Sequence, residues 1–321
     1  MVSWHKGDVI MNIFEKAENF VYRNARPLDL ALWQYHFEGG AAENVLKALS
    51  AYQNPDGGFG HALEPDNFTP VSSPMQTWAA TEIIDELAPS DNKNKLVKGI
   101  LRYLESGSCF DNEKMQWLNT IPENNDYPCA IWWKYGENGS DFRYNPTAAL
   151  AGFALKYADK NSCLYKLSKN IAVRGIEWFS ENVPFDEMHI TNCFIRLYEY
   201  LKSSAEKITD MSAFETMLKK QVNSSICRDT EKWKNEYVPL PSVFITSKDS
   251  IFYPDNSELI RRECEHIKSI QLKDGSFPVN WIWCNDYKEY ELSVNWWKSK
   301  FCISNMLFLR EFDAVNVSEN L

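Results

Sequence analysis

The sequence lacks the features that define several large classes of protein. No stretch reaches the roughly 18 apolar residues of a membrane-spanning helix, and the amino terminus shows no basic stretch followed by an apolar run. Lys and Arg number 34 against 44 Asp and Glu, and no basic stripe is present, so nucleic acid is not an expected partner. We expect a cytoplasmic protein without an integral membrane segment.

Motifs for metals and nucleotides are also missing. The five histidines form no HxxxH pair and the eight cysteines form no CxxC pair, so we expect no bound metal and no other cofactor. The run from Gly57 to Gly60 lacks the preceding strand that a phosphate-binding loop requires. Scattered cysteines in a chain without a signal sequence indicate free thiols in a reducing compartment.

The chain contains two copies of a short motif. Residues 52–60 read Tyr-Gln-Asn-Pro-Asp-Gly-Gly-Phe-Gly and residues 270–277 read Ile-Gln-Leu-Lys-Asp-Gly-Ser-Phe, so both contain Gln-x-x-Asp-Gly-small-Phe. Asp-Gly favours a tight turn with positive φ at the glycine. We expect the glutamine to bond free carbonyls at the end of its own helix and the phenylalanine to hold the turn against the helices. A degenerate third copy lies at residues 106–110.

Hydrophobic periodicity predicts helices in pairs around these turns. The expected pairs are 12–24 with 27–37, 42–53 with 73–87, 94–105 with 145–158, 167–181 with 188–203, 211–226 with a weak partner near 242–252, and 257–271 with 299–312. The fifth partner is ambiguous, because Val243 to Thr246 would also suit a strand. Ser72 or Ser73 before Pro74, and Asn145 before Pro146, are start signals for inner helices.

The two members of a pair differ in character. Helix 94–105 has one apolar face, with Leu96 and Ile100, and one charged face. Helix 145–158 is apolar all round, which is typical of a helix enclosed by others. With the first members outside and the second members inside, the sequence predicts an all-α fold. The expected architecture is an (α/α)6 toroid in a single domain of residues 1–321, with two concentric rings around a central cavity.

These turns and pairs resemble a known family. The two Gln-x-x-Asp-Gly turns look like the QW-type repeats of squalene–hopene cyclases, and the arrangement resembles protein prenyltransferase β-subunits. The chain is most similar to short bacterial proteins described as prenyltransferase-like or squalene-cyclase-like, above all between Gln271 and Phe312. The resemblance covers about residues 40–312 in outline. It implies a toroid and an apolar, isoprenoid-type substrate for a transferase, lyase or isomerase.

The catalytic motifs of that family do not carry over. The sequence has neither the Asp-x-Asp-Asp acid motif nor the Asp-Asp-x-x-Asp magnesium motif, and the zinc-binding Asp, Cys and His have no matching positions. The resemblance therefore implies a toroid fold with a cavity and an apolar ligand, and it identifies no catalytic residues. Residues that perform chemistry have to be sought on other grounds.

The segment from His61 to Asn67 is the first candidate for chemistry. It leads from an outer helix into the inner helix 73–87, which places His61, Glu64 and Asp66 near a cavity mouth. A carboxyl group whose pKa is raised by apolar walls can act as a general acid. The structural alternative is that Glu64 and Asp66 cap helix ends or hydrogen-bond within the loop.

The start of helix 188–203 is the second candidate. Asp186 is expected to be a helix cap, because the helix dipole favours an acid there. His189 is less easily explained by structure, so we group it with His61, Glu64 and Asp66 as a candidate catalytic residue.

Candidate substrate-binding residues are basic or aromatic. Arg143, next to Tyr144, would bind a diphosphate or a carboxylate, or would pair with Asp141 on the surface. Aromatic walls stabilise carbocations and stack on sugars, although most Trp residues simply fill cores. The aromatic candidates are Trp78, Trp281, Trp283 and Trp297. The aromatic segment 106–144 is a candidate lid.

Three functions remain open at this point. The first is a terpene-cyclase-like or prenyltransferase-like enzyme with an apolar small-molecule substrate and acid–base help from His61, Glu64 or Asp66. The second is a carbohydrate-active hydrolase or lyase, in which Glu64 or Asp66 works with a partner such as Glu187. The third is a binding protein without catalysis. A closed apolar pocket favours the first, and an open polar groove favours the second.

Overall fold

The computed structural model describes residues 12–136, 143–203 and 207–313. Eleven α-helices occupy these ranges: α1 (Ile13–Asn24), α2 (Pro27–Phe37), α3 (Ala42–Ser50), α4 (Pro74–Glu86), α5 (Asp91–Glu105), α6 (Thr147–Tyr157), α7 (Cys163–Asn182), α8 (Met188–Lys202), α9 (Met211–Ser225), α10 (Tyr253–Ile270) and α11 (Glu289–Phe312). Short 3-10 turns lie at Pro122–Asp126, Ile131–Trp133, Lys232–Lys234 and Pro241–Val243. The fold is all-α apart from a small hairpin of β1 (Phe110–Asp111) and β2 (Gln116–Trp117).

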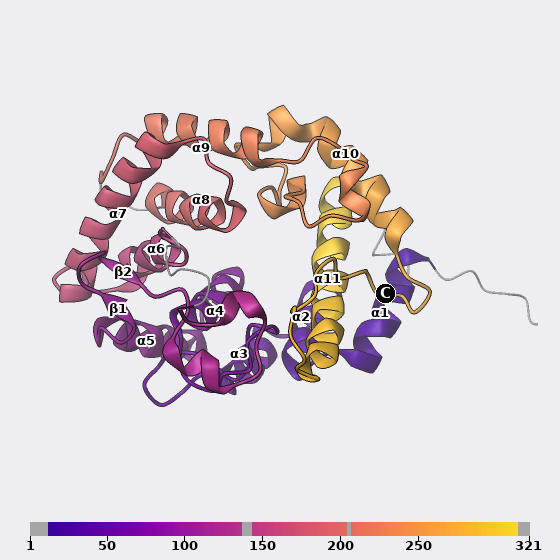
Figure 1. The fold of residues 1–321 in the computed structure, drawn as a ribbon, viewed down its shortest axis with the longest axis horizontal. Coiled ribbons are helices and arrows are strands. Elements are labelled where there is room, and N and C mark those ends of the chain that lie inside the picture. Colours follow the sequence, from indigo (N-terminus) through magenta and orange to yellow (C-terminus); the bar gives the residue numbers. More distant parts are fainter. Residues whose placement is uncertain (1–11, 137–142, 204–206, 314–321) are drawn as a thin grey trace, which may run out of the picture.

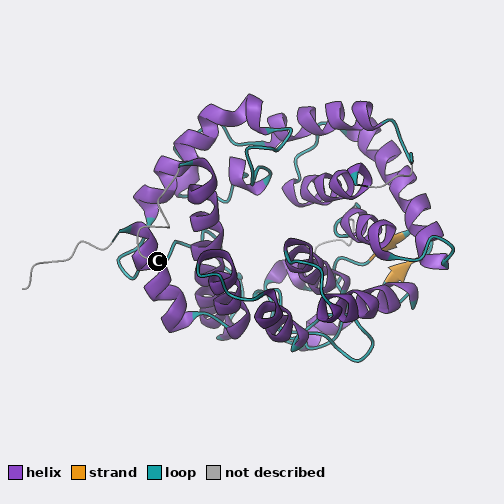
Figure 2. Cartoon of the chain, turned by 180° about the vertical axis from the view of Figure 1, so that it is seen from behind, coloured by secondary structure: helices purple, strands orange, loops and turns teal. Residues whose placement is uncertain are grey.

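The helices follow a closed path. Figure 1 shows α3, α5, α7, α9, α10 and α1 along the outside of the molecule, with α2, α4, α6, α8 and α11 inside them. The last helix, α11, packs against α1, α2 and α10, so the end of the chain meets its beginning. Seen from behind, the helices again surround the centre, and the hairpin lies at one edge (Figure 2).

The difference between outer and inner helices follows from their sequences. Every residue of α6 from Thr147 to Leu155 is buried, because α7 and α8 pack on it and α4 and α5 also contact it. In α5, Leu96 and Ile100 are buried while Lys95 and Lys98 on the other face are exposed. An amphipathic helix covers an enclosed one, as its hydrophobic pattern predicts.

The expected fifth inner helix is wrong. Between Ile226 and Tyr253 the chain makes only two 3-10 turns, one of which ends at Val243, and this region forms no α-helix and no strand. Pro239 and Pro241 provide the reason, because each lacks a backbone N–H and restricts the residue before it. A loop therefore occupies the position of an inner helix between α9 and α10.

Several helix starts also differ from the prediction: α5, α7 and α10 begin at Asp91, Cys163 and Tyr253, three or four residues early. Helix α11 begins at Glu289, ten residues before the expected start, since no Gly or Pro interrupts residues 289–312. Ser73 caps α4 as expected, by accepting a hydrogen bond from Gln76 N at 3.2 Å. Asn145 does not cap α6, which starts at Thr147 with Pro146 at the cap position.

The glutamine of each repeated turn joins two neighbouring outer helices. Gln53 Nε2 donates to Gly57 O at 2.9 Å and to Leu96 O of α5 at 3.1 Å. Gln271 Nε2 donates in the same way to Gly275 O at 3.0 Å and to Ile13 O of α1 at 2.8 Å. The expectation that the glutamine bonds the end of its own helix is therefore wrong. The amide instead links its turn to the next outer helix.

The rest of each turn behaves as its residues predict. Gly57 and Gly275 have φ values of 101° and 95°, and the phenylalanines of both turns, Phe59 and Phe277, are buried. A Cβ atom at Gly57 would lie 2.0 Å from Gly99 O of α5, and one at Gly275 would lie 2.1 Å from Lys16 O of α1. The third copy lacks the glutamine, and at its Gly107 a Cβ would meet open space.

One apolar core runs through both sets of helices, and a smaller cluster lies beside it. The smaller cluster contains Met75, Cys129, Ala130, Trp133 and Trp283. Within the described residues, no helix is both long and apolar enough to cross a membrane.

The docking of the turns can be tested with two glycines. Gly57→Ala is expected to lower the free energy of unfolding by more than about 3 kcal/mol, because positive φ and a backbone clash both oppose the new methyl group. Gly107→Ala, which also has positive φ but open space around it, is expected to lower it by only about 1 kcal/mol. Urea unfolding measures both. Equal losses would show that the packing of the Gly57 turn on α5 contributes nothing.

Candidate functional site

The loop that carries Glu64 is held by a buried arginine. Arg26 forms an ion pair with Asp29 at 2.7 Å, and its Nη1 donates to Ala62 O at 2.7 Å and to Leu63 O at 3.3 Å. Leu63 N donates to Gln76 Oε1 of α4 at 2.9 Å. The backbone on both sides of Leu63 is therefore fixed, and the next side chain, Glu64, is directed to the interior.

Glu64 faces a cavity of about 320 Å³ between α2, α4 and α11. Most of its wall surface is apolar and comes from Leu28, Leu32, Leu63, Trp78, Ala79, Ile83, Ile303 and Leu307. The other lining residues are polar or charged: Arg26, Asp29, His36, Glu64, Glu82, Glu86, Lys300 and Ser304. We call this space the Glu64 cavity. A volume of this size suits a small-molecule site.

Glu64 differs from the other carboxylates of this cavity. Asp29 pairs with Arg26, Glu82 pairs with Arg196, and Glu86 Oε2 lies 3.3 Å from His36 Nε2. Within the described residues the Glu64 side chain has no hydrogen-bond or ion-pair partner. It is the carboxyl group in this wall whose oxygens are free to meet a ligand.

Burial raises the pKa of Glu64 to about 7. Removal from water disfavours the charged form and outweighs the opposing field of Lys300, while the negative charge of Asp66 adds to the rise and Arg26 opposes it. Near neutral pH the group is therefore present in both protonation states. A general acid works best under this condition.

Asp66 has a structural role although it lies only two residues further on. It is 3 % exposed, and its Oδ1 accepts hydrogen bonds from Trp283 Nε1 at 2.7 Å and from Ser293 Oγ at 2.6 Å. Its backbone oxygen accepts from Ala130 N at 2.9 Å. Asp66 thus joins the loop to α11 and to the segment before it, and it does not line the Glu64 cavity.

The structure does not bring the two candidate histidines to Glu64. His61 is exposed, has φ of 60°, and its Nε2 lies 2.9 Å from Asn54 Oδ1. His189 lines a different cavity, and its Nε2 lies 3.4 Å from the hydroxyl of Tyr237. Loss of solvent lowers the pKa of His189, and the charge of Glu187 opposes this effect. The four candidate catalytic residues therefore occupy separate surroundings.

The second cavity has a volume of about 310 Å³ and lies where the fifth inner helix is missing. Residues of α8, α10, α11 and the loop after α9 line it, so we call it the α8–α11 cavity. Tyr237, Trp281, Trp297 and Phe301 form one aromatic wall, with the Trp281 and Trp297 ring centroids 5.2 Å apart. Ser304 lines both cavities, so they adjoin along α11.

Glu263 on the outer helix α10 reaches this second cavity. It is 1 % exposed, and its Oε2 accepts a hydrogen bond from Ser242 N at 2.9 Å. Burial raises its pKa to about 7 against the hydrogen bonds from Ser242. The sequence analysis missed this residue, although a signal exists: Glu263 falls on the apolar stripe of Leu259, Ile260 and Ile267.

The candidate binding residues divide between the cavities and the core. Trp78 lines the Glu64 cavity and donates its Nε1 proton to Glu82 at 3.1 Å, while Trp281 and Trp297 line the α8–α11 cavity. Trp283 is buried and holds Asp66.

Arg143 and Tyr144 line neither cavity. Tyr144 is buried against Trp178 and Phe194, with ring centroids 5.5 and 5.6 Å away. Arg143 is exposed. Asp141, its expected surface partner, lies outside the described residues.

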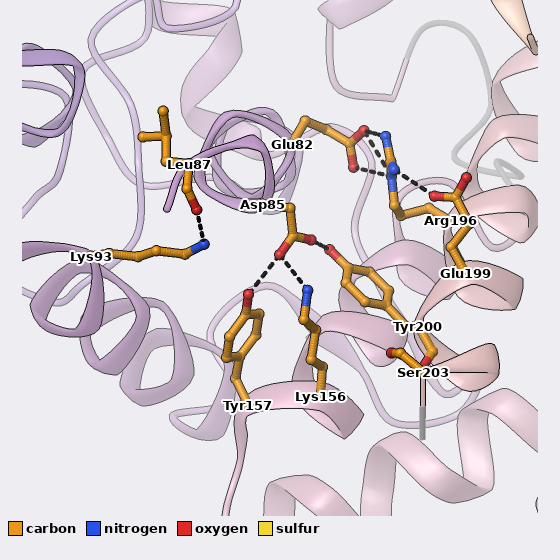
Figure 3. Close-up of polar contacts among 10 residues, drawn as sticks. All are labelled: Glu82, Asp85, Leu87, Lys93, Lys156, Tyr157, Arg196, Glu199, Tyr200 and Ser203. Carbon is orange, nitrogen blue, oxygen red and sulfur yellow. Dashed lines mark hydrogen bonds and ion pairs between the residues drawn. The ribbon is translucent and has the colours of Figure 1, made fainter. Parts of the chain in front are cut away.

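A network of charged and phenolic groups links the last turns of α4, α6 and α8 (Figure 3). Arg196 bonds both oxygens of Glu82 and also Glu199. Asp85 accepts hydrogen bonds from Lys156 at 2.9 Å, from Tyr157 at 2.7 Å and from Tyr200. Because each carboxylate already has partners, the network is suited to holding three inner helices together.

The candidate lid packs on the loop that carries Glu64. Phe68 N donates to Pro128 O at 3.0 Å, and Ile131 N donates to Trp283 O at 3.2 Å. None of the described residues of the segment 106–144 lines the Glu64 cavity or the α8–α11 cavity. In the described ranges no group of three His, Cys, Asp or Glu is placed to hold a metal ion.

Comparison of the chain with protein-family models, with curated proteins and with solved structures gave no match. Function is therefore argued from the geometry of the two cavities.

The pKa of Glu64 predicts how stability changes with pH. The folded pKa of about 7 lies above the ordinary value of 4.5, so between these values the folded state holds more protons than the unfolded state. Stability therefore falls as pH rises through this window. Glu64→Gln should match the wild type near pH 4.5 and exceed it by about 2–3 kcal/mol at pH 8.

Urea unfolding at a series of pH values measures this difference. The exposed Glu113→Gln is the control, and it should leave the curve within about 0.5 kcal/mol of the wild type. A Glu64→Gln curve parallel to that of the wild type would show that Glu64 titrates with its ordinary pKa.

Proposed function

We propose that the protein is an enzyme of terpene-cyclase-like or prenyltransferase-like character that acts on an apolar, isoprenoid-type small molecule in the Glu64 cavity. The observation that carries the proposal is Glu64 itself. It is an unpartnered carboxyl group with a pKa of about 7 in an apolar wall. A structural carboxylate would normally have bonded partners, as the other three in this cavity do.

The proposal includes the architecture of an (α/α)6 toroid with one inner position filled by a loop. The alternation of amphipathic and enclosed helices supports it, as does the packing of α11 on α1 and α2. The glutamine contacts at Gln53 and Gln271 also support it, because each joins one outer helix to the next. We place the protein in the cytoplasm as part of the same proposal, because all eight cysteines are free thiols.

Glu64 would act as the general acid. The neutral carboxyl group gives its proton to a substrate oxygen on which negative charge develops, and the carboxylate remains in the wall. Lys300 and Arg26 both lower the pKa of Glu64 electrostatically, so their charges stabilise the carboxylate that forms. Trp78 presents an aromatic surface to the same space, which favours positive charge on a substrate.

The two alternatives draw less support from this cavity. A carbohydrate-active enzyme works with two carboxyl groups across its site. Four carboxyl groups line this cavity, but Asp29, Glu82 and Glu86 are each in an ion pair, so Glu64 has no second free carboxyl group opposite it. A binding protein without catalysis needs no proton donor, so this alternative gives the raised pKa of Glu64 no role. The binding alternative predicts that replacing Glu64 changes neither the affinity for a ligand nor the rate of any reaction.

Ligand binding in the Glu64 cavity can be blocked by filling it. Ala79→Phe places a ring in the cavity from α4 and is expected to weaken binding of farnesol or squalene at least tenfold, because the ligand and the new ring compete for one space. Titration calorimetry in detergent measures this. Ala213→Phe, on the exposed surface of α9, is the control. Absence of binding to the wild type, or equal affinity in both variants, would contradict the proposal.

Catalysis is tested separately with Glu64→Gln, which keeps the shape and removes the acid. We expect the variant to bind the same probes within about threefold and to lose at least a hundredfold in product formation, in line with the usual contribution of a general acid. Product analysis by mass spectrometry after incubation with farnesyl and geranylgeranyl substrates measures turnover. Unchanged turnover would remove Glu64 from the mechanism.

A further inference from the structure

The Glu64 cavity has two different ends. The loop that carries Glu64 lies at the starts of α2 and α4, where Arg26 donates to Ala62 O and Gln76 accepts from Leu63 N. At the other ends of the same two helices, His36 Nε2 lies 3.3 Å from Glu86 Oε2. The two helices therefore run in the same direction, and the cavity extends along them from Glu64 to this ion pair.

Helix α11 follows the same course along the third side. Asn295 Nδ2 donates to Asn24 O, just before α2, at 3.1 Å. Fifteen residues later, Arg310 Nη1 donates to His36 O, near the end of α2, at 2.6 Å. Lys300 is only five residues beyond Asn295, so it lines the Glu64 end of the cavity.

The stretch between the two ends is apolar and has a defined length. Leu28, Leu32 and His36 line the cavity at intervals of four residues along α2. A helix rises about 1.5 Å per residue, so these eight residues span about 12 Å. Ala79, Ile83 and Ile303 cover the other sides of this stretch. An extended carbon chain with bonds of about 1.5 Å advances about 1.25 Å per bond, so about ten carbon atoms fit between the ends.

Lys300 brings a positive charge to the Glu64 end. In the described ranges Lys300 has no ion-pair partner, Glu64 included, and its Nζ lies 4.6 Å from the centroid of the Trp297 ring. An aromatic ring attracts an ammonium group without neutralising it. After burial, which raises the pKa of Glu64, the field of Lys300 has the largest effect on that pKa and lowers it. The ammonium group is therefore near the carboxyl group, and neither is bonded to the other.

The charges at this end favour one negative charge on a ligand. With Glu64 neutral, the ion pair of Arg26 with Asp29 and the single charge of Lys300 leave one positive charge. A carboxylate would neutralise Lys300 and accept a hydrogen bond from neutral Glu64. An ammonium ligand would be repelled by Lys300, and a diphosphate carries more charge than one free cation balances. The other charged or titratable groups around this space are Asp66, which is bonded to Trp283 and Ser293, Glu82 with Arg196, His36 with Glu86, and the phenol of Tyr237.

We infer that the Glu64 cavity takes an apolar monocarboxylate with a chain of about ten carbon atoms, whose carboxylate lies between Lys300 and Glu64. The chain runs along α2 toward the far end of the cavity. This inference rests on the proposed function, because it names the substrate class of the same site. Its binding experiment requires no turnover, so the two are tested separately.

The experiment compares decanoate, decanol and decylamine by titration calorimetry on the full chain at pH 6. We expect decanoate to bind at least about tenfold more tightly than decanol, the effect of one charge-assisted interaction, and decylamine to bind most weakly. Lys300→Gln is expected to remove the advantage of decanoate over decanol. The matched control is Lys298→Gln, which loses a surface ion pair with Asp274 and does not line the cavity, so it should keep that advantage.

The pH dependence of binding provides a second readout. Decanoate is anionic from pH 6 to pH 8, whereas Glu64, with a pKa of about 7, loses its proton in this range. Wild-type affinity for decanoate should fall about tenfold between these pH values, because only the neutral form of Glu64 accepts a carboxylate beside it. Glu64→Gln should bind decanoate with nearly constant affinity over the same range. A fall that persists in this variant would assign the titration to another group, such as His36, and would overturn the inference.

The remaining outcomes separate the inference from the proposed function. Binding of farnesol together with weak or no binding of decanoate would overturn the inference and leave the proposed function standing. Equal affinity of the wild type and Lys300→Gln for decanoate would also overturn it, provided that both have the same melting temperature. Tight, Lys300-dependent binding of decanoate that Ala79→Phe blocks would support the inference even if Glu64→Gln leaves turnover unchanged.

Discussion

The amide of one glutamine in each repeated turn sets the distance between neighbouring outer helices. Gln53 and Gln271 each bond the glycine carbonyl of their own turn and a carbonyl of the next helix. Two hydrogen bonds from one nitrogen leave little freedom for the turn to shift. The second of these contacts spans 258 residues, from Gln271 to Ile13, and so joins α10 to α1. The two turns therefore fix how α3 meets α5 and how α10 meets α1.

The loop between α9 and α10, which contains Pro239 and Pro241, borders the α8–α11 cavity. Without an inner helix in front of it, α10 faces the interior directly, so Glu263 reaches a cavity from the outer layer. The loop that breaks the repeat therefore lies beside the more polar of the two cavities.

Local chemistry could be predicted from the sequence, and long-range contacts could not. The Asp-Gly pairs predict positive φ at Gly57 and Gly275 because this depends on adjacent residues alone. The enclosed character of α6 follows from its uninterrupted apolar sequence. The bond from Trp283 to Asp66 joins residues 217 positions apart, and no pattern predicts it. The second acceptor of Gln53 on α5 was missed for the same reason, since it depends on which helices become neighbours.

Glu64 and Asp66 show how two carboxyl groups in one loop acquire opposite roles. Pro65 separates them, and the chain turns one to the interior and the other toward α11. Asp66 meets a tryptophan and a serine, and its Oδ1 accepts a hydrogen bond from each, so this side chain joins segments of the structure. Glu64 shares its cavity with leucines and with a tryptophan whose N–H is already bonded to Glu82. It forms no ion pair with Lys300 in the same wall, and its burial makes it harder to ionise. Asp66 is held by two donors of the protein, whereas the oxygens of Glu64 are open to the cavity, so Glu64 is where a reaction is to be sought.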